Sequence, residues 1–193
     1  MIHLIETTHA GSVPASELPD WALSHGVTSL STAEVMHLCG LPANQVSQRM
    51  ASLRKGGKLF SPARGLWVPI PPEYRTWGAP DPMGYIDDMM AHLGAGYLVG
   101  WLTAAERHGA SHHAAQVFQV ATDKPVRARA FGRSRLEFYA RSYVGSATQS
   151  AELLRNTGVC VASPGATMLM LAADPGMCGG MSNVANLVIE LAE

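Results

Sequence analysis

The sequence predicts a mixed α+β fold, with an N-terminal winged helix-turn-helix followed by a mixed α/β C-terminal domain. Two helical patterns around a tight turn at 40–42, followed by two short apolar runs within 58–68, predict the winged module. Helix and strand patterns alternate in the second half of the chain, which predicts the α/β domain. We therefore expect a winged domain at 1–72, a proline-rich linker at 73–82 and a C-terminal domain at 83–193.

Composition sets the class of protein. Hydrophobic residues make up 47% of the 193 residues and charged residues 15%, so the chain can bury a core and is not of the disordered type. The three cysteines are an odd number without a C-x-x-C spacing, which argues against a disulfide framework and a structural zinc. Because no signal peptide and no apolar run of about 20 residues is visible, we expect a cytoplasmic protein without a membrane partner.

The winged module begins with a helix predicted over Pro14–His25, with Ser16 as its cap. A second helix opens with a capping box, in which the side chains of Ser31 and Glu34 satisfy each other's free backbone N–H groups. Gly40 ends this helix.

The third helix is predicted over Ala43–Lys55, because Val46, Met50 and Leu53 recur at spacings of four and three and form one buried stripe. Two apolar runs around a turn at 61–65 then predict a β-hairpin, the wing.

The other face of the third helix is polar and basic, and the segment 43–65 holds five basic residues and no acid. Asn and Gln can pair bidentately with adenine and Arg with guanine in the major groove, whereas Lys and Arg also bind phosphates. The same pattern would suit any solvated helix, but together with the order of elements it favours binding of double-stranded DNA. The predicted DNA-binding residues are Asn44, Gln45, Ser47, Gln48, Arg49, Ser52, Arg54, Lys55, Lys58 and Arg64.

A second basic stretch runs from residue 124 to 141 and holds one acid, Glu137. Two interpretations stay open: an ordinary charged loop and strand face, or a secondary basic patch that extends the DNA footprint or docks an acidic partner. The residues of this patch are Lys124, Arg127, Arg129, Arg133 and Arg135.

The C-terminal half mixes helical and strand patterns without an internal repeat. Helices are expected at 83–93, at 96–108, from Ser163-Pro164 through Leu171, and from a Ser182 cap through Leu191. Strands are expected at 116–121, 135–140 and 158–162.

No catalytic motif is visible, so we predict that the protein is not an enzyme and needs no cofactor. His108 and His112 have the i, i+4 spacing of metal ligands, but Gly109 and Ser111 interrupt the helix that this geometry needs. We therefore predict no metal site.

Three segments resemble the AbiEi family of antitoxins. Residues 96–110 (GYLVGWLTAAERHGA) resemble its Y-x-G-x-L-S-A-A-x-x-H-G helix, and 116–122 (QVFQVAT) with the later Arg135-Leu136-Glu137-Phe138 resemble the strands that follow. Residues 163–169 (SPGATML) resemble its S/T-P-E-x-T-x-L-D helix start, with Gly165 and Met170 where the family usually has Glu and Asp.

This resemblance implies an antitoxin of a bicistronic toxin–antitoxin module used in phage defence by abortive infection. It implies that the winged module represses the operon's own promoter, commonly at inverted repeats. It also implies that the C-terminal domain counteracts a nucleotidyltransferase toxin without requiring a stable complex.

Two alternative functions stay open. One is a winged-helix transcription factor whose C-terminal domain senses a small ligand, with Trp101, His108, His112 and Tyr143 as candidate pocket residues. The other is an enzyme acting on nucleic acid with the winged module as its targeting arm, which the lack of a catalytic set disfavours.

Overall fold

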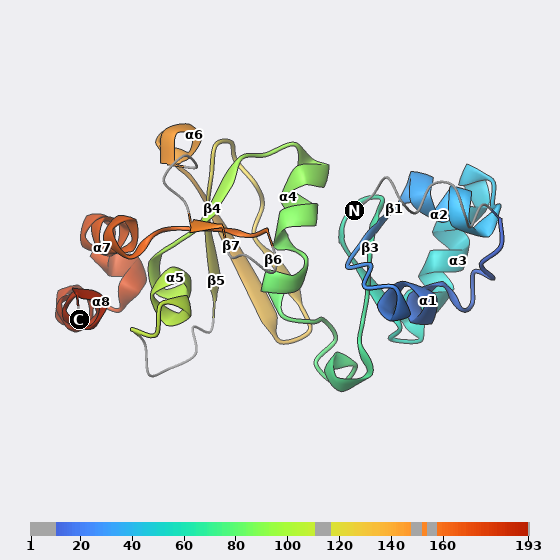
Figure 1. The fold of residues 1–193 in the computed structure, drawn as a ribbon, viewed down its shortest axis with the longest axis horizontal. Coiled ribbons are helices and arrows are strands. Elements are labelled where there is room, and N and C mark those ends of the chain that lie inside the picture. The colour runs from blue at the N-terminus through green and yellow to red at the C-terminus, as the bar shows by residue number, and fades with distance from the viewer. Residues whose placement is uncertain (1–10, 111–116, 148–151, 154–157, 193) are drawn as a thin grey trace. The chain divides into compact units, whose positions relative to one another are not determined.

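The computed structural model describes residues 11–110, 117–147, 152–153 and 158–192 (Figure 1). The chain divides into two compact units. The N-terminal unit comprises Met1–Leu93 with Phe131–Arg133, and the C-terminal unit comprises Gly94–Ala130 with Ser134–Glu193.

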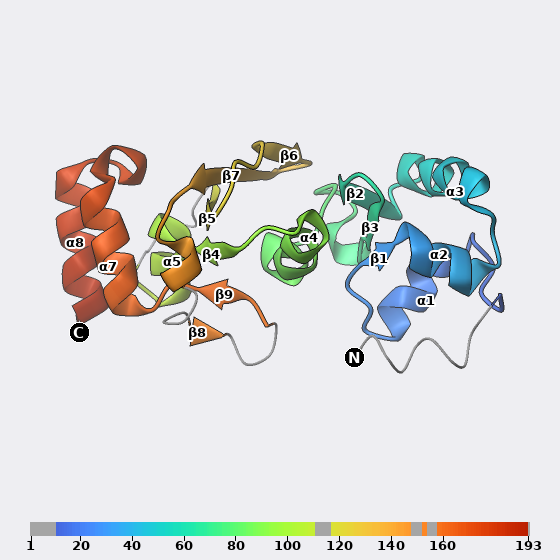
Figure 2. The same ribbon diagram turned by 90° about the horizontal axis from the view of Figure 1, so that it is seen from above.

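The N-terminal unit has the element order of a winged helix, as predicted (Figures 1 and 2). Its three strands form an antiparallel sheet in the order β1-β3-β2, so the hairpin strand β3 lies between its partner β2 and the short strand β1. The elements are α1 (Leu18–Ser24), β1 (Leu30–Ser31), α2 (Thr32–Cys39), α3 (Ala43–Lys55), β2 (Leu59–Ala63) and β3 (Leu66–Pro69).

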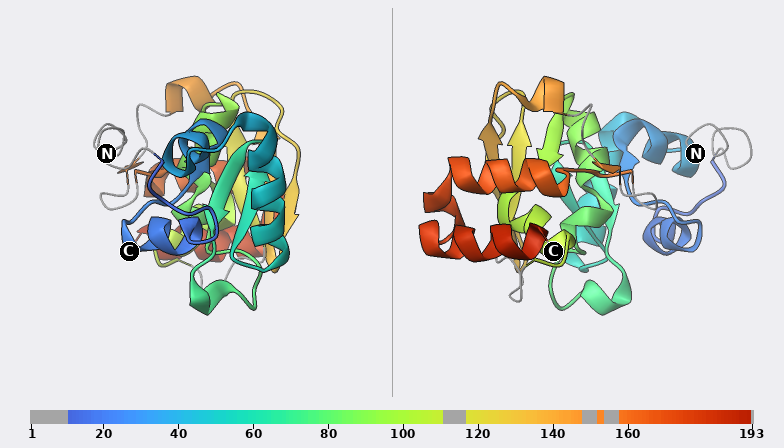
Figure 3. Two further views of the ribbon diagram at one scale, coloured as in Figure 1. Left: turned by 90° about the vertical axis from the view of Figure 1, so that its right-hand side faces the viewer. Right: turned by 60° about the vertical axis from the view of Figure 1, so that its left-hand side comes forward.

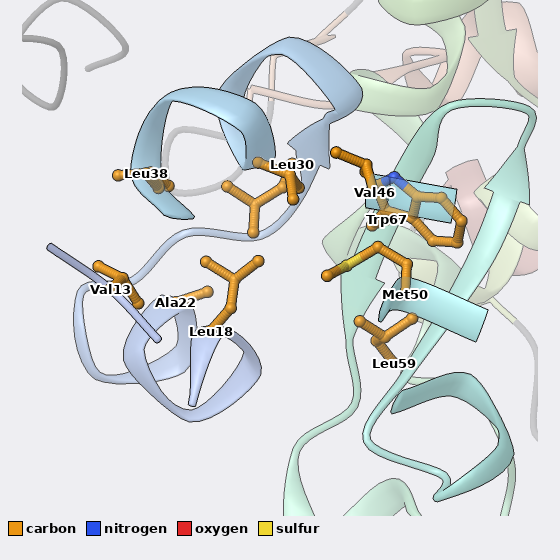
Figure 4. Packing of buried hydrophobic residues seen from close by; sticks show 10 residues of the cluster. Val13, Leu18, Ala22, Leu30, Leu38, Val46, Met50, Leu59 and Trp67 are labelled. Atoms are coloured by element: carbon orange, nitrogen blue, oxygen red, sulfur yellow. The ribbon is translucent and has the colours of Figure 1, made fainter. Parts of the chain in front are cut away.

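One hydrophobic core joins the helices to this sheet (Figure 4). Val46 and Met50 of α3 are completely buried, and they pack with Leu59 of β2 and Trp67 of β3 in the same cluster as Leu18 of α1. Burying such side chains stabilises the fold by about 1.5–3 kcal/mol each. The apolar stripe of α3 is therefore fixed against the core, as the sequence predicts.

The predicted boundaries of α2 and α3 are confirmed. Ser31 Oγ accepts a hydrogen bond from the Glu34 N–H at 3.2 Å, and the Ser31 N–H donates to Glu34 Oε2 at 2.7 Å. Gly40 ends α2 with a left-handed φ of 62°. The first helix was predicted too long: it begins at Leu18, and its N-cap Glu17 makes no side-chain cap bond, because residues 14–17 form a separate turn.

The turn of the β-hairpin is tighter than predicted. The strand β2 continues through Ser61 to Ala63 past an irregularity in its register, so the turn at Arg64 and Gly65 replaces the predicted five-residue turn. The Ser61 hydroxyl donates to the Ala63 carbonyl at 2.7 Å, which satisfies a polar group in the irregular stretch.

The residues beyond the hairpin are packed into the N-terminal unit. Two 3₁₀ turns, Pro72–Tyr74 and Pro82–Gly84, lead into α4 (Ile86–Leu93). The sequence predicts a linker at 73–82 and a C-terminal domain that includes α4, whereas by compactness the chain divides after Leu93.

Residues 131–133 belong to the same unit. The rings of Phe131 and Phe60 lie 5.1 Å apart, and the Arg133 N–H donates to the Trp77 carbonyl at 3.1 Å. Gly132, with a φ of 55°, is so close to this carbonyl that a Cβ there would overlap with the Trp77 oxygen. A glycine is therefore required at this position.

The C-terminal unit is built on a mixed six-stranded sheet in the order β6-β7-β5-β4-β9-β8, with α5, α7 and α8 on one side of it (Figures 1 and 3). Pairing is parallel for β5 with β7 and β4 with β9, and antiparallel for β4 with β5 and β8 with β9. The strands are β4 (Tyr97–Val99), β5 (Phe118–Thr122), β6 (Arg129–Phe131), β7 (Ser134–Ala140), β8 (Glu152–Leu153) and β9 (Cys160–Val161). The helices are α5 (Trp101–Arg107), α6 (Val144–Ala147), α7 (Pro164–Ala173) and α8 (Met181–Ala192), with a 3₁₀ turn at Pro175–Cys178.

The helix expected over 96–108 was wrong in its first part. Tyr97–Val99 forms the strand β4 between β5 and β9, and the helix α5 starts only at Trp101. A strand buried on both faces is apolar at every position, so periodicity cannot distinguish it from the first turn of a buried helix.

The other predicted elements of this unit are found with shifted ends. Strands β5, β7 and β9 and helix α7 are confirmed, and Ser163 caps α7 by accepting a hydrogen bond from the Ala166 N–H at 3.3 Å. The predicted cap at Ser182 was wrong, because α8 already begins at Met181. Residue 116 of the predicted strand lies outside the described residues.

The two glycines Gly132 and Gly165 should respond to alanine with opposite signs. Gly132→Ala should lower the free energy of unfolding by at least about 1–3 kcal/mol, because its backbone conformation is strained for alanine and the Trp77 carbonyl blocks the Cβ. Gly165→Ala should raise it by about 0.4–1 kcal/mol, since this position in the first turn of α7 has no atom within 4 Å of the new Cβ. Urea denaturation followed by circular dichroism measures both. Equal effects of the two substitutions would contradict the packing of Gly132.

Candidate nucleic-acid interface

All eight candidate residues on α3 are exposed: Asn44, Gln45, Ser47, Gln48, Arg49, Ser52, Arg54 and Lys55. The cause is the burial of Val46 and Met50, which directs the remaining positions of this amphipathic helix away from the core.

These residues do not share a single line on the helix. At about 100° per residue, Asn44, Gln48 and Lys55 lie directly opposite the buried stripe. On one side of this line follow Ser52, Gln45 and Arg49, in order of increasing distance from it. Ser47 and Arg54 lie on the other side. The centre of the exposed face is therefore formed by the two amides and the ammonium group of Lys55, with a guanidinium on each side.

Most cations of this surface have no counter-ion. The side chains of Arg49, Arg54, Lys55 and Arg64 make no ion pair or hydrogen bond with any residue that the structure describes. The segment 43–65 contains no carboxylate, which explains this. An anion can therefore approach these four side chains without displacing an internal partner.

Lys58 differs from these cations. Its Nζ lies 3.2 Å from Asp20 Oδ2 of α1, and the same carboxylate lies 3.5 Å from Arg75. Lys58 is also half-buried, whereas Arg64 is exposed at the hairpin turn. Of the predicted phosphate-binding residues, Lys58 is thus the one whose charge is already partly neutralised.

The residues of the second basic stretch are distributed over both units. Arg133 belongs to the N-terminal unit, where its guanidinium lies 5.9 Å from the centre of the Trp77 ring. In the C-terminal unit, Lys124 Nζ donates to the Gly94 carbonyl at 2.7 Å and Arg135 pairs with Glu137 at 2.7 Å. Of the remaining two predicted residues, Arg127 is exposed and Arg129 is half-buried.

Two of the four candidate ligand-pocket residues, Trp101 and His108, make internal hydrogen bonds. Trp101 is completely buried, and its indole N–H donates to Asp174 Oδ2 at 3.2 Å. His108 Nε2 lies 2.7 Å from the Ala162 carbonyl, to which it donates, since a carbonyl only accepts. Tyr143 is exposed, and His112 lies outside the described residues. Among the described members of this set, Trp101 and His108 thus already have internal hydrogen-bond partners.

A buried polar network around Trp101 was not visible in the sequence. Trp101 has a φ of 49°, which is rare for a side chain of this size. The Arg141 guanidinium lies 5.6 Å from the Trp101 ring centre and pairs with Asp174 at 3.0 Å. Gln119 is buried beside it, accepting from the Leu102 N–H at 3.0 Å and donating to the Met177 carbonyl at 3.2 Å. This network fixes α5 and the chain after α7 to strands β5 and β7.

Burial lowers the reactivity of two of the three cysteines. Cys178 is completely buried, and burial, with a smaller contribution from the charge of Asp174, raises the pKa of its thiol to about 11. Burial also raises the pKa of the Cys39 thiol in the N-terminal unit. Because the thiolate is the nucleophile, these shifts lower the reactivity of both thiols at neutral pH. Among the described residues, no cluster of His, Cys, Asp or Glu is suited to hold a metal ion.

The fold and this basic surface define the class of protein: a winged-helix module joined to an α/β domain. The family model of the AbiEi antitoxin C-terminal domain matches residues 97–193, half of the chain. The chain therefore belongs to the AbiEi antitoxin family, which is regulatory rather than catalytic.

The fold is also found in a solved structure. The crystal structure of the Rv2827c protein from Mycobacterium tuberculosis is similar with a TM-score of 0.61 and 16% sequence identity. The match covers 95% of this chain and 69% of the other, and at this identity it shows a common fold. No curated protein matches the sequence. In the described part of the chain, no helix has the length and apolar character to span a membrane.

The reactivity of the Cys178 thiol tests whether this side chain is buried in the C-terminal unit. Iodoacetamide at pH 8 should label it at least 100-fold more slowly in the folded protein than in guanidinium chloride, because a pKa higher by two units lowers the thiolate fraction roughly 100-fold. Peptide mass spectrometry would follow each cysteine separately. Equal labelling rates in the folded and unfolded protein would contradict the burial of this thiol.

Proposed function

We propose that this protein is a DNA-binding transcriptional autorepressor and antitoxin that counteracts a nucleotidyltransferase toxin. The observation that carries the DNA-binding part is the exposed face of α3, with two amides at its centre and unpaired cations around them. Membership in the AbiEi family supports the antitoxin part.

In this proposal α3 enters the major groove of double-stranded DNA in the protein's own promoter, at inverted repeats. Asn44 and Gln48 read base edges, with Gln45 and Arg49 reading from the flank of the helix. Arg54, Lys55 and Arg64 bind phosphates, assisted by Lys58 and the hydroxyls of Ser47 and Ser52. The second basic stretch contributes through Arg127 and Arg129. By contrast, Lys124 already bonds to the Gly94 carbonyl and Arg135 already pairs with Glu137.

The C-terminal domain supplies the antitoxin activity without requiring a stable complex with the toxin. Its buried polar groups are used to hold helices on the sheet, which suits a domain that acts through its surface. The ligand-sensing alternative is less well supported, because Trp101 and His108 already have internal hydrogen-bond partners.

Base-reading and phosphate-binding residues should differ in their effects on DNA binding. Gln48→Ala and Arg49→Ala should each weaken binding to the upstream DNA by about 1–3 kcal/mol and relax its specificity. Arg64→Ala should weaken binding to all sequences and reduce the slope of log K against log salt by about one unit. Fluorescence anisotropy against upstream and scrambled DNA measures both, with Arg107→Ala as an exposed-cation control outside the basic stretches. The same loss on both DNAs for every variant would contradict this division.

Asp20 should act against DNA binding. Asp20→Asn removes the negative charge that pairs with Lys58 and Arg75, so affinity for any DNA should rise and the salt dependence should become steeper. Because this ion pair is exposed, the stability of the fold should change little. Unchanged affinity at low salt would mean that Lys58 does not take part in binding.

The antitoxin part is tested by co-expression with a nucleotidyltransferase toxin encoded next to this protein. Growth should be restored by the full chain and by a variant carrying both Gln48→Ala and Arg49→Ala, since repression and neutralisation use different domains. If the wild-type chain does not restore growth, the antitoxin role is lost while DNA binding stands.

A further inference from the structure

We infer that His92 is a positioning residue of the DNA-binding surface: it holds the hairpin turn from which Arg64 projects. His92 lies in the last turn of α4, and its Nε2 is 2.9 Å from the Arg64 carbonyl oxygen. Because a carbonyl only accepts, this nitrogen carries the proton and donates. The phosphate contact of Arg64 rests on the proposed function, whereas the hydrogen bond by which His92 holds the turn does not.

The turn is held from two sides. The Gly65 carbonyl accepts from the Thr32 N–H at 2.9 Å and from the Thr32 hydroxyl at 3.3 Å. A Cβ at Gly65 would lie 3.3 Å from the Thr32 hydroxyl oxygen and 3.9 Å from Cε1 of His92. The turn thus fits between the start of α2 and the imidazole, and its two carbonyls are bonded to different elements.

The helix that carries His92 is itself well anchored. Ile86, Met89 and Met90 of α4 are completely buried. The Thr28 hydroxyl, two residues before β1, donates to Asp88 Oδ2 at 2.6 Å. The imidazole is therefore presented by a fixed helix, although His92 is exposed.

The consequence concerns the Arg64 side chain, which is exposed and has no partner among the described residues. A side chain that must be ordered on binding weakens affinity, and fixing its backbone in advance removes part of that cost. His92 fixes the Arg64 carbonyl and hence the direction in which the guanidinium leaves the turn. This makes α4 a functional part of the winged module, although α4 contributes no side chain to the face of α3.

The test compares His92→Ala with His92→Gln, whose amide can donate from the position of Nε2, and with His25→Ala as a control for loss of an exposed histidine. In the free protein, amide hydrogen exchange of the peptide covering 60–68 should be faster in His92→Ala and near wild type in His92→Gln and His25→Ala. On upstream DNA, His92→Ala should bind about 3- to 10-fold more weakly, with substantial recovery in His92→Gln. In a background of Arg64→Ala, His92→Ala should have no further effect.

Unchanged exchange in His92→Ala would overturn the inference whether or not the protein binds DNA. Suppose that amide exchange is faster in His92→Ala but that the losses of DNA affinity in His92→Ala and Arg64→Ala add fully in the double variant. This result would overturn the inference that His92 acts on DNA binding through Arg64. A wild-type protein that binds no DNA would overturn the proposed function and with it the phosphate role of Arg64, and exchange would still decide whether His92 holds the turn.

Discussion

The burial of one stripe of α3 is the constraint on which the winged module depends. Val46 and Met50 are inaccessible to solvent because they pack on the side chains of β2, β3 and α1. A helix held in this way cannot rotate, so the residues opposite the stripe are exposed by necessity. The same packing that stabilises the fold thereby determines which amides and cations face outward. No further contact is needed to orient them.

Charge is distributed to match this arrangement. Carboxylates are missing from residues 43–65, so the cations there keep their full charge. The exception, Lys58, has Asp20 as its partner, and this ion pair links α1 to the start of β2. An exposed ion pair contributes little to stability. Its effect falls mainly on the electrostatics of the surface, because Asp20 neutralises part of the positive charge at one edge.

The C-terminal unit follows a different principle. Several polar side chains around Trp101 are bonded internally. Trp101 and Arg141 share Asp174, and Gln119 bonds to main-chain atoms of two different elements. An unmatched polar group in such a place would be costly, so these residues define one arrangement of α5 on the sheet. The strained φ of Trp101 is tolerated because its ring is held by the same contacts.

The sequence predicted those features that are encoded locally. The capping box of α2, the buried stripe of α3 and the Ser163 cap depend on residues spaced three or four positions apart, and they are confirmed. Long-range pairing was not predictable. Tyr97–Val99 becomes a strand only because β5 and β9 lie beside it, and α4 packs with the N-terminal unit through residues that carry no signal of their partner.

The same distinction applies to the candidate interface. The polar face of α3 could be derived from periodicity, because a helix repeats every 3.6 residues whatever surrounds it. The ion pair of Lys58 with Asp20 joins residues 38 positions apart, and the bond of His92 to the Arg64 carbonyl joins residues 28 positions apart. Neither has a sequence pattern, since a carbonyl is present at every residue and a single carboxylate can serve many cations. The sequence therefore predicted which side chains of α3 face outward, and the structure adds the contacts that hold or neutralise residues of this surface.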